Sequence, residues 1–349
     1  MQQINVPGEC GQTSAPVHIS SAMTPADWYG AIMCRISNRF RMKYTVTPGL
    51  YALGNPDKDS VVLVTSNYRL SLNVLRSALN NRNAWVLVVD TKGINVWCAA
   101  GKGTFCTKEI VKQIVSSNLI SRISHRTLIL PQLGASGVSS AKLQKASGFT
   151  VKFGPVRASD IPAYLDNDCK ASPEMRQARF TLTDRVKLVP MEAIPALKKL
   201  GLFLLIASVL FGITRTGIIY KQAIIGVWPL VIPGLTAVLT GSVIIPLLLP
   251  FIPGRAFSLK GLITGLIGAI AIVVLLPVYR SSALLSAFCL ISVPASSSFL
   301  SFLFTGSSTY TSPSGVKTEL KIALPLYITS AVVSTVLLTL TLTRFWGIL

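Results

Sequence analysis

Between residues 60 and 165 the apolar positions alternate between two patterns. Short runs of consecutive apolar residues, which suit strands buried on both faces of a sheet, are followed by segments with the apolar spacing of a helix face. The predicted strands cover 61–64, 85–89, 128–130 and 151–153, with helices at 69–82, 107–117 and about 137–147. This order predicts a doubly wound α/β sheet.

Four segments directly follow these strands: residues 65–67, 90–102, 131–136 and 154–155. In sheets of this type, ligands bind beyond the carboxyl ends of the strands. Because these ends meet at one edge of a parallel sheet, we expect all four segments to line a single site.

Beyond about residue 195 the apolar runs are long enough to cross a bilayer, which takes roughly 20 residues. The predicted spans are about 196–214, 223–252, 257–279, 283–304 and 322–343. The mean hydropathy of +0.56 with 13% charged residues is unusual for a soluble protein. We therefore predict an N-terminal extension (1–44), an α/β domain (45–190) and an all-α transmembrane domain of about five helices (191–349).

The charges around the spans indicate an orientation. Residues 1–30 lack the continuous apolar core of a secretory signal, so the α/β domain is expected in the cytoplasm, where thiols stay reduced. More cations then flank the inner span ends than the outer ones, as multi-pass proteins of the inner (cytoplasmic) membrane prefer. The inner cations are Lys198, Lys199, Arg255, Lys260, Lys317 and Lys321; the outer ones are Arg215, Lys221, Arg280 and Arg344.

The charge of the part before about residue 200 bears on partners: it contains 25 Lys and Arg residues against 12 Asp and Glu residues, a net charge of about +13. An excess of cations suits an acidic partner protein. It suits the anionic lipids of the inner leaflet equally well, and both interpretations stay open. No nucleic-acid partner is expected.

One segment carries the candidate chemistry: residues 95–102 read Asn-Val-Trp-Cys-Ala-Ala-Gly-Lys. Asn95 is a good N-cap, which places Cys98 third in a short helix, and Gly101 is expected to end the helix in the left-handed conformation. The positive end of the helix dipole favours the thiolate of Cys98, a nucleophile or metal ligand. Alternatively, Cys98 is a small buried apolar residue, as many free cysteines are.

The motifs that nucleotide-binding loops and zinc or iron–sulfur sites require are missing from this sequence, and it has few histidines for histidine-dependent catalysis. A P-loop would need glycine at Val96 and a hydroxyl residue at Gly103, and no Gly-x-Gly-x-x-Gly turn follows a strand. The six cysteines form no C-x-x-C pair, which argues against a zinc ribbon or an iron–sulfur cluster within this chain. The two histidines, His18 and His125, are expected to be structural or solvated. The partner of Cys98 is therefore expected to be a bound cofactor.

The segment 95–102 resembles the cap-helix motif of the HgcA family of mercury-methylating corrinoid proteins. The segments 64–68, 90–94, 130–134 and 154–158 agree with this resemblance, as does a C-terminal membrane domain of about five spans. The resemblance covers most of the chain from about residue 45. It implies a Rossmann-like corrinoid-binding domain, similar to that of the corrinoid iron–sulfur protein of the acetyl-CoA pathway.

The resemblance also implies roles for individual residues. Cys98 would be the lower axial ligand of cobalt, so the corrinoid needs no protein histidine. Thr65 would contact the corrin, Asn95 would orient the ligand helix and Trp97 would pack beside the ring. Small residues would let the helix press against the macrocycle, and Lys102 would pair with a helix-end carbonyl or contact the ligand. The predicted cofactor-binding set is Thr65, Asn67, Asn95, Val96, Trp97, Cys98, Ala99, Ala100, Gly101 and Lys102.

The implied activity is methyl transfer to inorganic Hg(II), giving methylmercury. Electrophilic Hg(II) takes the methyl group as a carbanion equivalent, and a thiolate would stabilise the Co(III) left behind. Two electrons restore Co(I), which implies a separate ferredoxin-like iron–sulfur donor, and a methyl donor protein or methyl-folate supplies the methyl group. Cys106 is expected either to be packed or to bind Hg(II) near the site.

Two rival functions differ in class. One is a membrane transporter with a regulatory α/β domain, because prolines interrupt several spans. Residues 201–349 contain no methionine, no histidine and only Cys289, so a relay of soft ligands for mercuric ion cannot be built there. The other rival is a non-enzymatic corrinoid store.

Overall fold

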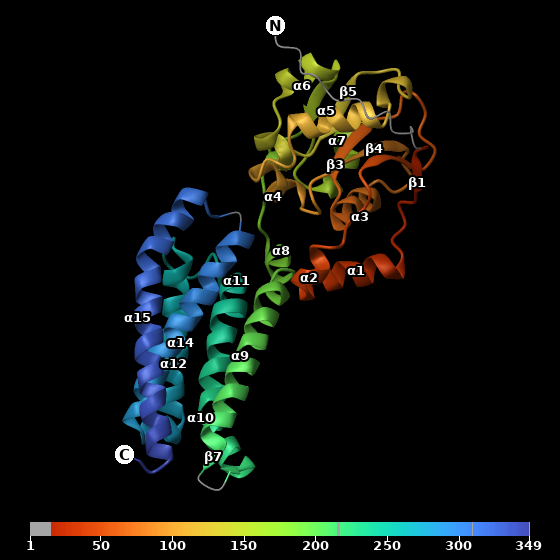
Figure 1. Ribbon diagram of the computed structural model, residues 1–349. Coiled ribbons are helices and arrows are strands. Elements are labelled where there is room, and N and C mark those ends of the chain that lie inside the picture. Colours follow the sequence, from red (N-terminus) through yellow and green to blue (C-terminus); the bar gives the residue numbers. More distant parts are fainter. Residues whose placement is uncertain (1–14, 215–216, 309, 349) are drawn as a thin grey trace. The chain divides into compact units, whose positions relative to one another are not determined.

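The chain consists of two compact units. The computed structural model describes residues 15–214, 217–308 and 310–348, so Cys10 and Arg215 lie outside the described residues. The first unit ends at Arg179 and the second begins at Phe180 (Figure 1). This boundary precedes the expected one after residue 190, because α8 (Leu182–Val186) and the start of α9 (Val189–Gly212) already belong to the helical unit.

The described part of the N-terminal unit forms a six-stranded sheet in the order β1-β2-β4-β3-β5-β6. The strands are β1 (Val17–Ile19), β2 (Gly49–Leu53), β3 (Val62–Ser66), β4 (Ala84–Val89), β5 (Thr127–Leu130) and β6 (Thr150–Phe153). Strands β4, β3, β5 and β6 run parallel, as the sequence pattern predicts. Strand β2 is antiparallel to β4, and β1 pairs parallel with β2, so the sheet is mixed rather than purely parallel.

Helices cover both faces of this sheet. They are α3 (Arg69–Ala78), α4 (Val96–Gly101), α5 (Thr107–Ser116), α6 (Ser140–Ser147) and α7 (Ile161–Asp166). Val62 and Val64 of β3 share a core with residues of α4, α5 and α6, whereas the intervening Leu63 packs with residues of α3 and α7. This alternation confirms the predicted two-sided α/β architecture.

The described part of the expected N-terminal extension belongs to the α/β unit. Strand β1 completes one edge of the sheet, and α1 (Pro25–Ile36) contacts α3 and α2 (Asn38–Arg41). A capping box at Thr24 and Pro25 at the first helical position define the start of α1.

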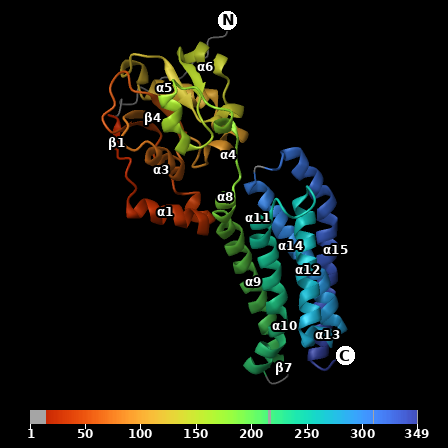
Figure 2. The same cartoon turned by 180° about the vertical axis from the view of Figure 1, so that it is seen from behind.

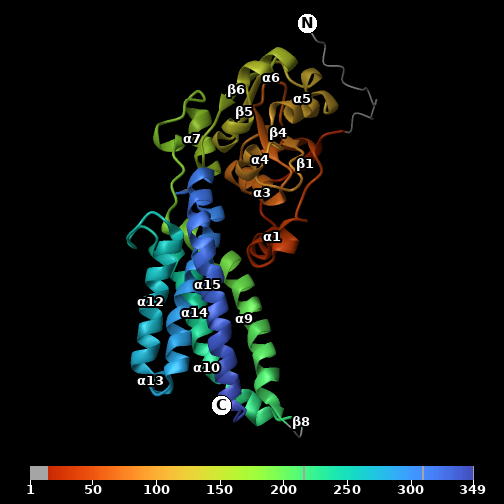
Figure 3. The same cartoon turned by 60° about the vertical axis from the view of Figure 1, so that its left-hand side comes forward.

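The C-terminal unit is helical. It contains α10 (Tyr220–Val238), α11 (Ile245–Leu248), α12 (Phe257–Leu275), α13 (Pro277–Arg280), α14 (Ala283–Leu303) and α15 (Pro313–Phe345). Five helical segments in the described part of the chain are long and apolar enough to cross a membrane: Leu182–Gly212, Tyr220–Leu248, Phe257–Leu275, Ala283–Ser307 and Ser314–Phe345. These agree with the predicted spans. Within this unit α8 and the end of α15 lie at opposite ends, as five crossings require (Figure 2), and Figure 3 shows the helices of the unit from another side.

Small residues allow α12 and α14 to pack closely in this unit. A Cβ atom on Gly261 of α12 would lie 2.6 Å from the Ser297 carbonyl oxygen of α14, and one on Gly265 would lie 2.8 Å from the Pro294 Cα atom. Glycines four residues apart form the small-residue pattern with which membrane helices approach one another. Any larger residue at either position would push α12 and α14 apart.

Candidate functional site

A cavity of about 410 Å³ lies at the carboxyl edge of the parallel strands. Its lining includes Thr65 from β3, Asn95 and Trp97 from the start of α4, Pro131 after β5 and Pro155 after β6. All four post-strand segments therefore contribute, and the expectation that they line one site is confirmed.

The cavity wall is mainly apolar. Among the described residues that line it, none carries a charged side chain, and the polar ones are Thr65, Tyr68, Ser71 and Asn95. Burial raises the pKa of Tyr68, and a hydrogen bond with the Cys34 thiol raises it further, so the phenol stays neutral. Tyr68 and Ser71 were not among the predicted site residues, although Tyr68 lies two residues after the end of β3 and Ser71 is in the first turn of α3. An uncharged apolar wall suits the edge of a large organic ligand better than a phosphate.

The cap helix α4 begins as predicted. The Asn95 side-chain oxygen accepts a hydrogen bond from the Cys98 backbone N–H at 2.9 Å. The Cys98 side chain is half-buried, and Trp97 beside it is 40% exposed. The expected stop at Gly101 is wrong, because Gly101 is still helical and the left-handed position falls on Gly103 (φ +76°). The turn needs these two additional residues so that the Thr104 N–H can reach the Ala99 carbonyl.

The inner side of α4 is packed against the core. Ala99 and Ala100 are 0% and 6% exposed and belong to the hydrophobic core. A Cβ atom on Gly137, in the neighbouring 3-10 helix Gln132–Gly137, would clash with the Phe105 carbonyl and lie 3.1 Å from the Ala100 Cα atom. The two alanines are therefore small because the core leaves no room. The outward-facing residues of α4 and its cap are Trp97, Cys98, Gly101 and Lys102.

Asn67 holds the loop that leads into α4. Its side-chain oxygen accepts hydrogen bonds from the backbone N–H groups of Thr91 and Gly93, each at 3.0 Å. Its amide nitrogen donates to the Asp90 carboxylate at 3.1 Å. The loop turns through Lys92 and Gly93, both at positive φ. Asn67 is 6% exposed and is not among the cavity-lining residues, so in this structure it positions the loop.

Asn67→Ala is expected to loosen this loop. The buried Thr91 and Gly93 N–H groups lose their acceptor, and each buried group without a partner costs about 1–3 kcal/mol. We expect lower thermal stability and faster amide hydrogen exchange at these two residues. As a control, Asn80→Ala removes only an exposed hydrogen bond to Ser21 and should leave both measurements unchanged. Unaltered exchange in Asn67→Ala would contradict the assignment.

Within the described part of the chain, no group of three or more His, Cys, Asp or Glu residues could hold a metal ion. A metal at Cys98 would therefore need further ligands from a cofactor or another protein. Cys106, at the N-cap of α5, is partly exposed and does not line the cavity. Cys34 is buried, which raises the pKa of its thiol. His125 bonds the Ser60 carbonyl at 3.0 Å, in keeping with the structural role expected for it.

A second cavity, of about 510 Å³, lies within the helical unit between residues of α9, α10, α14 and α15. Apolar side chains form most of its wall, with Lys199 as the one charged residue among the described lining residues. The hydroxyl-bearing residues that line it are Ser292, Ser296, Tyr327, Ser330, Ser334 and Thr335. None of the described lining residues is a cysteine, methionine or histidine, so this cavity offers no soft metal ligand.

Residues 35–165 match the family described as CO dehydrogenase/acetyl-CoA synthase delta subunit. Similar proteins are gamma subunits of the acetyl-CoA decarbonylase/synthase complex. The one from Methanopyrus kandleri is 32% identical over 126 residues, which cover 35% of this chain and 27% of the relative. The one from Methanocaldococcus jannaschii is 32% identical over 130 residues, which cover 37% of this chain and 26% of the relative.

The matched residues lie within the α/β unit. They include strands β2 to β6, the cap helix and the cavity, and they end before the candidate spans. The chain spans only about a quarter of the length of these two relatives (27% and 26%). The α/β domain is thus similar to part of these complex subunits.

Proposed function

We propose that this protein is a membrane-anchored corrinoid protein that transfers a methyl group to inorganic Hg(II), giving methylmercury. One observation carries the proposal. The Cys98 thiol lies in the first turn of the cap helix at the carboxyl edge of the sheet, within a segment that resembles the motif of the mercury-methylating corrinoid proteins. The similarity of the α/β domain to subunits of the acetyl-CoA decarbonylase/synthase complex supports a role in one-carbon chemistry.

The residues present fit a corrinoid. A Cβ atom on Gly101 would meet nothing within 4 Å, so the outer side of α4 is open where a flat ring would lie. Cys98 would ligate the cobalt, while Thr65, Asn95 and Trp97 would contact the ring from the cavity side. Ala99 and Ala100 would support the helix from behind, and Asn67 would fix the loop that precedes it.

When bound, the corrinoid would supply a cobalt atom that carries the methyl group. This chain would supply the ligand and its geometry. Asn95 fixes the backbone of Cys98 through the N-cap hydrogen bond. The neighbouring Trp97 contributes to the apolar wall of the cavity. A thiolate is a soft, strongly donating ligand, which suits transfer of a carbanion equivalent to a soft metal ion.

The chemistry also requires partners. Methyl transfer as a carbanion equivalent leaves the centre short of two electrons, and the described residues contain no cysteine cluster that could store them. We therefore assign the electrons to a separate ferredoxin-like iron–sulfur protein, and the methyl group to a methyl donor protein or methyl-folate. The excess of 25 Lys and Arg residues over 12 Asp and Glu residues before about residue 200 would favour an acidic donor. The five apolar helices would hold the protein in the inner membrane, with the α/β domain in the cytoplasm.

The first test is cobalamin binding by the full-length protein in detergent, under anaerobic conditions. We expect tight binding that Thr65→Val weakens about tenfold, because one hydrogen bond to the ligand is lost. Thr127→Val is the matched control, since Thr127 starts β5 at the opposite end of the strands and should not change binding. Failure of the wild-type protein to retain cobalamin would overturn the proposal.

A second candidate function is transport of a small solute through the helical unit, and the 510 Å³ cavity is the observation that favours it. Flux across proteoliposomes distinguishes the two functions. A transporter would move solute in the Cys98→Ala variant as fast as in the wild type, whereas our proposal places the essential group at Cys98.

A further inference from the structure

Helix α1 turns its large apolar side chains outward. Trp28 and Tyr29 are each 61% exposed, and Ile32 is 55% exposed. The side facing the domain consists of the buried Asp27, Gly30, Ala31 and Cys34. A surface helix of a soluble domain normally shows the reverse arrangement, with its apolar stripe toward the core.

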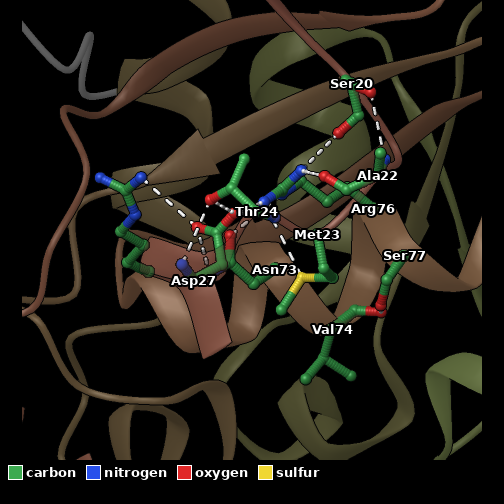
Figure 4. Close-up of polar contacts among 10 residues, drawn as sticks. Ser20, Ala22, Met23, Thr24, Asp27, Asn73, Val74, Arg76 and Ser77 are labelled. Carbon is green, nitrogen blue, oxygen red and sulfur yellow. Dashed lines mark hydrogen bonds and ion pairs between the residues drawn. The ribbon is translucent and has the colours of Figure 1, made fainter. Parts of the chain in front are cut away.

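This orientation is fixed by a buried polar cluster (Figure 4). The Asp27 carboxylate pairs with Arg76 of α3 and accepts a hydrogen bond from Asn73 at 3.0 Å. The Thr24 backbone N–H donates to the same carboxylate at 3.0 Å, which ties the start of the helix to the cluster. Trp28 is the residue next to Asp27 and is therefore held outward by the fold.

Cations accompany the apolar face. Arg39 and Lys43, in and after α2, are exposed, and Arg35 near the end of α1 is half-exposed. Asp27 is the only acidic residue between 20 and 48, and it is buried and paired. The surface formed by Trp28, Tyr29, Ile32, Ile36, Arg39 and Lys43, here called the α1 patch, thus combines aromatic and aliphatic groups with uncompensated positive charge.

We propose that the α1 patch docks onto the anionic headgroup layer of the membrane that the helical unit spans. Trp and Tyr concentrate at membrane interfaces, and exposed apolar groups accompanied by cations favour attachment to an anionic headgroup layer. Each cation near an anionic surface contributes about 1 kcal/mol. The patch supplies both the apolar and the electrostatic part of such an attachment.

The α/β unit is covalently joined to the candidate membrane spans, and this connection favours the bilayer over other binding partners of the α1 patch. The α/β unit ends at Arg179, and the helical segment that contains the first candidate span begins at Leu182. Under the proposed function, on which this inference rests, a short stretch of chain therefore keeps the domain tethered to the bilayer at all times. At such an effective concentration even a weak patch would be occupied. Docking would limit rotation of the α/β unit about its connection to the helices.

The test uses tryptophan quenching by brominated lipids in proteoliposomes of the full-length protein. The Trp28 signal is the difference between wild type and Trp28→Phe, and the Trp228 signal is obtained likewise from Trp228→Phe. Trp228 is 60% exposed on α10 and reports whether the helices are inserted. With phosphatidylglycerol present, we expect quenching of Trp28 of the same order as that of Trp228. Arg39→Gln/Lys43→Gln should reduce quenching of Trp28 but not of Trp228.

A matched control places a tryptophan at another exposed apolar position of the same unit. Val115 of α5 is 65% exposed, so Val115→Trp in the Trp28→Phe background should stay unquenched. An unquenched Trp28 beside a quenched Trp228 would overturn the docking proposal and leave the proposed membrane anchoring intact. If Trp228 is also unquenched, the anchoring fails and the docking proposal fails with it. A Trp28 signal that shifts to the blue only when an acidic iron–sulfur protein is added would assign the α1 patch to that partner instead.

Discussion

Cys98→Ala is expected to lower the rate of methylmercury formation by at least about 100-fold, above the loss typical for residues that only orient a metal ligand. The substitution removes the sulfur atom that would bind cobalt, while the Asn95 cap of α4 contacts only the backbone of residue 98. The helix should therefore persist, and the circular dichroism spectrum should not change. The measurement is methylmercury formed from Hg(II) by full-length protein with a methyl donor and a reductant, together with the cobalt absorption spectrum.

Cys106→Ala is the matched control for this experiment. Cys106 is half-buried like Cys98, and neither residue is among those that line the cavity. Cys106, however, precedes α5, outside the cap helix, and makes no side-chain capping bond. We expect its removal to leave the cobalt spectrum unchanged. A loss of activity in Cys106→Ala at high Hg(II) would instead support a role in binding the mercuric ion. A Cys98→Ala protein that methylates at nearly the wild-type rate would refute the assignment of the axial ligand.

Asp27→Asn is expected to lower the free energy of unfolding of the α/β unit by about 3–5 kcal/mol, because it leaves the buried Arg76 guanidinium without its counter-charge. Hydrogen exchange of the full-length protein in detergent, followed in peptides that cover α1 and α3, measures the effect. The control is Asp166→Asn, which removes an exposed ion pair to Arg82 and should leave exchange unaltered. Equal exchange in both variants would show that the cluster does not stabilise this unit.

The same cluster predicts a pH dependence. Burial by itself would raise the pKa of the Asp27 carboxyl, but hydrogen bonds from Thr24 and Arg76 and the charge of Arg76 hold it well below its ordinary value. A carboxyl with a lowered pKa in the folded state stabilises the fold at pH values above its unfolded pKa, about 3.9. This contribution declines as the pH falls below about 4. The protection of α1 against hydrogen exchange should therefore decrease more between about pH 5 and pH 3 in the wild type than in Asp27→Asn, which has no carboxyl group at position 27 to titrate.

The parallel strands and the cap helix were predictable because their signals are local. Strand β4 is an uninterrupted apolar run and β3 begins with one, and both strands are fully buried between helices on both faces. Asn95 marks the start of α4 because its side chain caps the helix by accepting a hydrogen bond from Cys98, only three residues further along the chain. The four site segments followed from the strands, since the carboxyl ends of parallel strands meet at one edge.

The N-terminal part of the domain was not predictable in this way. Strand β1 has three residues and lies at the sheet edge, too short to show a period. Helix α1 places small residues inward and large apolar ones outward, which inverts the rule by which burial is inferred from hydrophobicity. Asn67 owes its role to partners more than twenty residues away, and no local pattern in the sequence could reveal such a contact.

The packing behind the cap helix constrains how this sequence can change during evolution. Gly134 and Gly137 approach Val96, Ala100 and Phe105 so closely that one added methyl group would displace the helix. A lineage could therefore lose the position of the Cys98 sulfur through a substitution at a residue that never meets a ligand. Selection that keeps the chemistry of Cys98 at the outer face of α4 should therefore also keep Gly134 and Gly137 at its inner face.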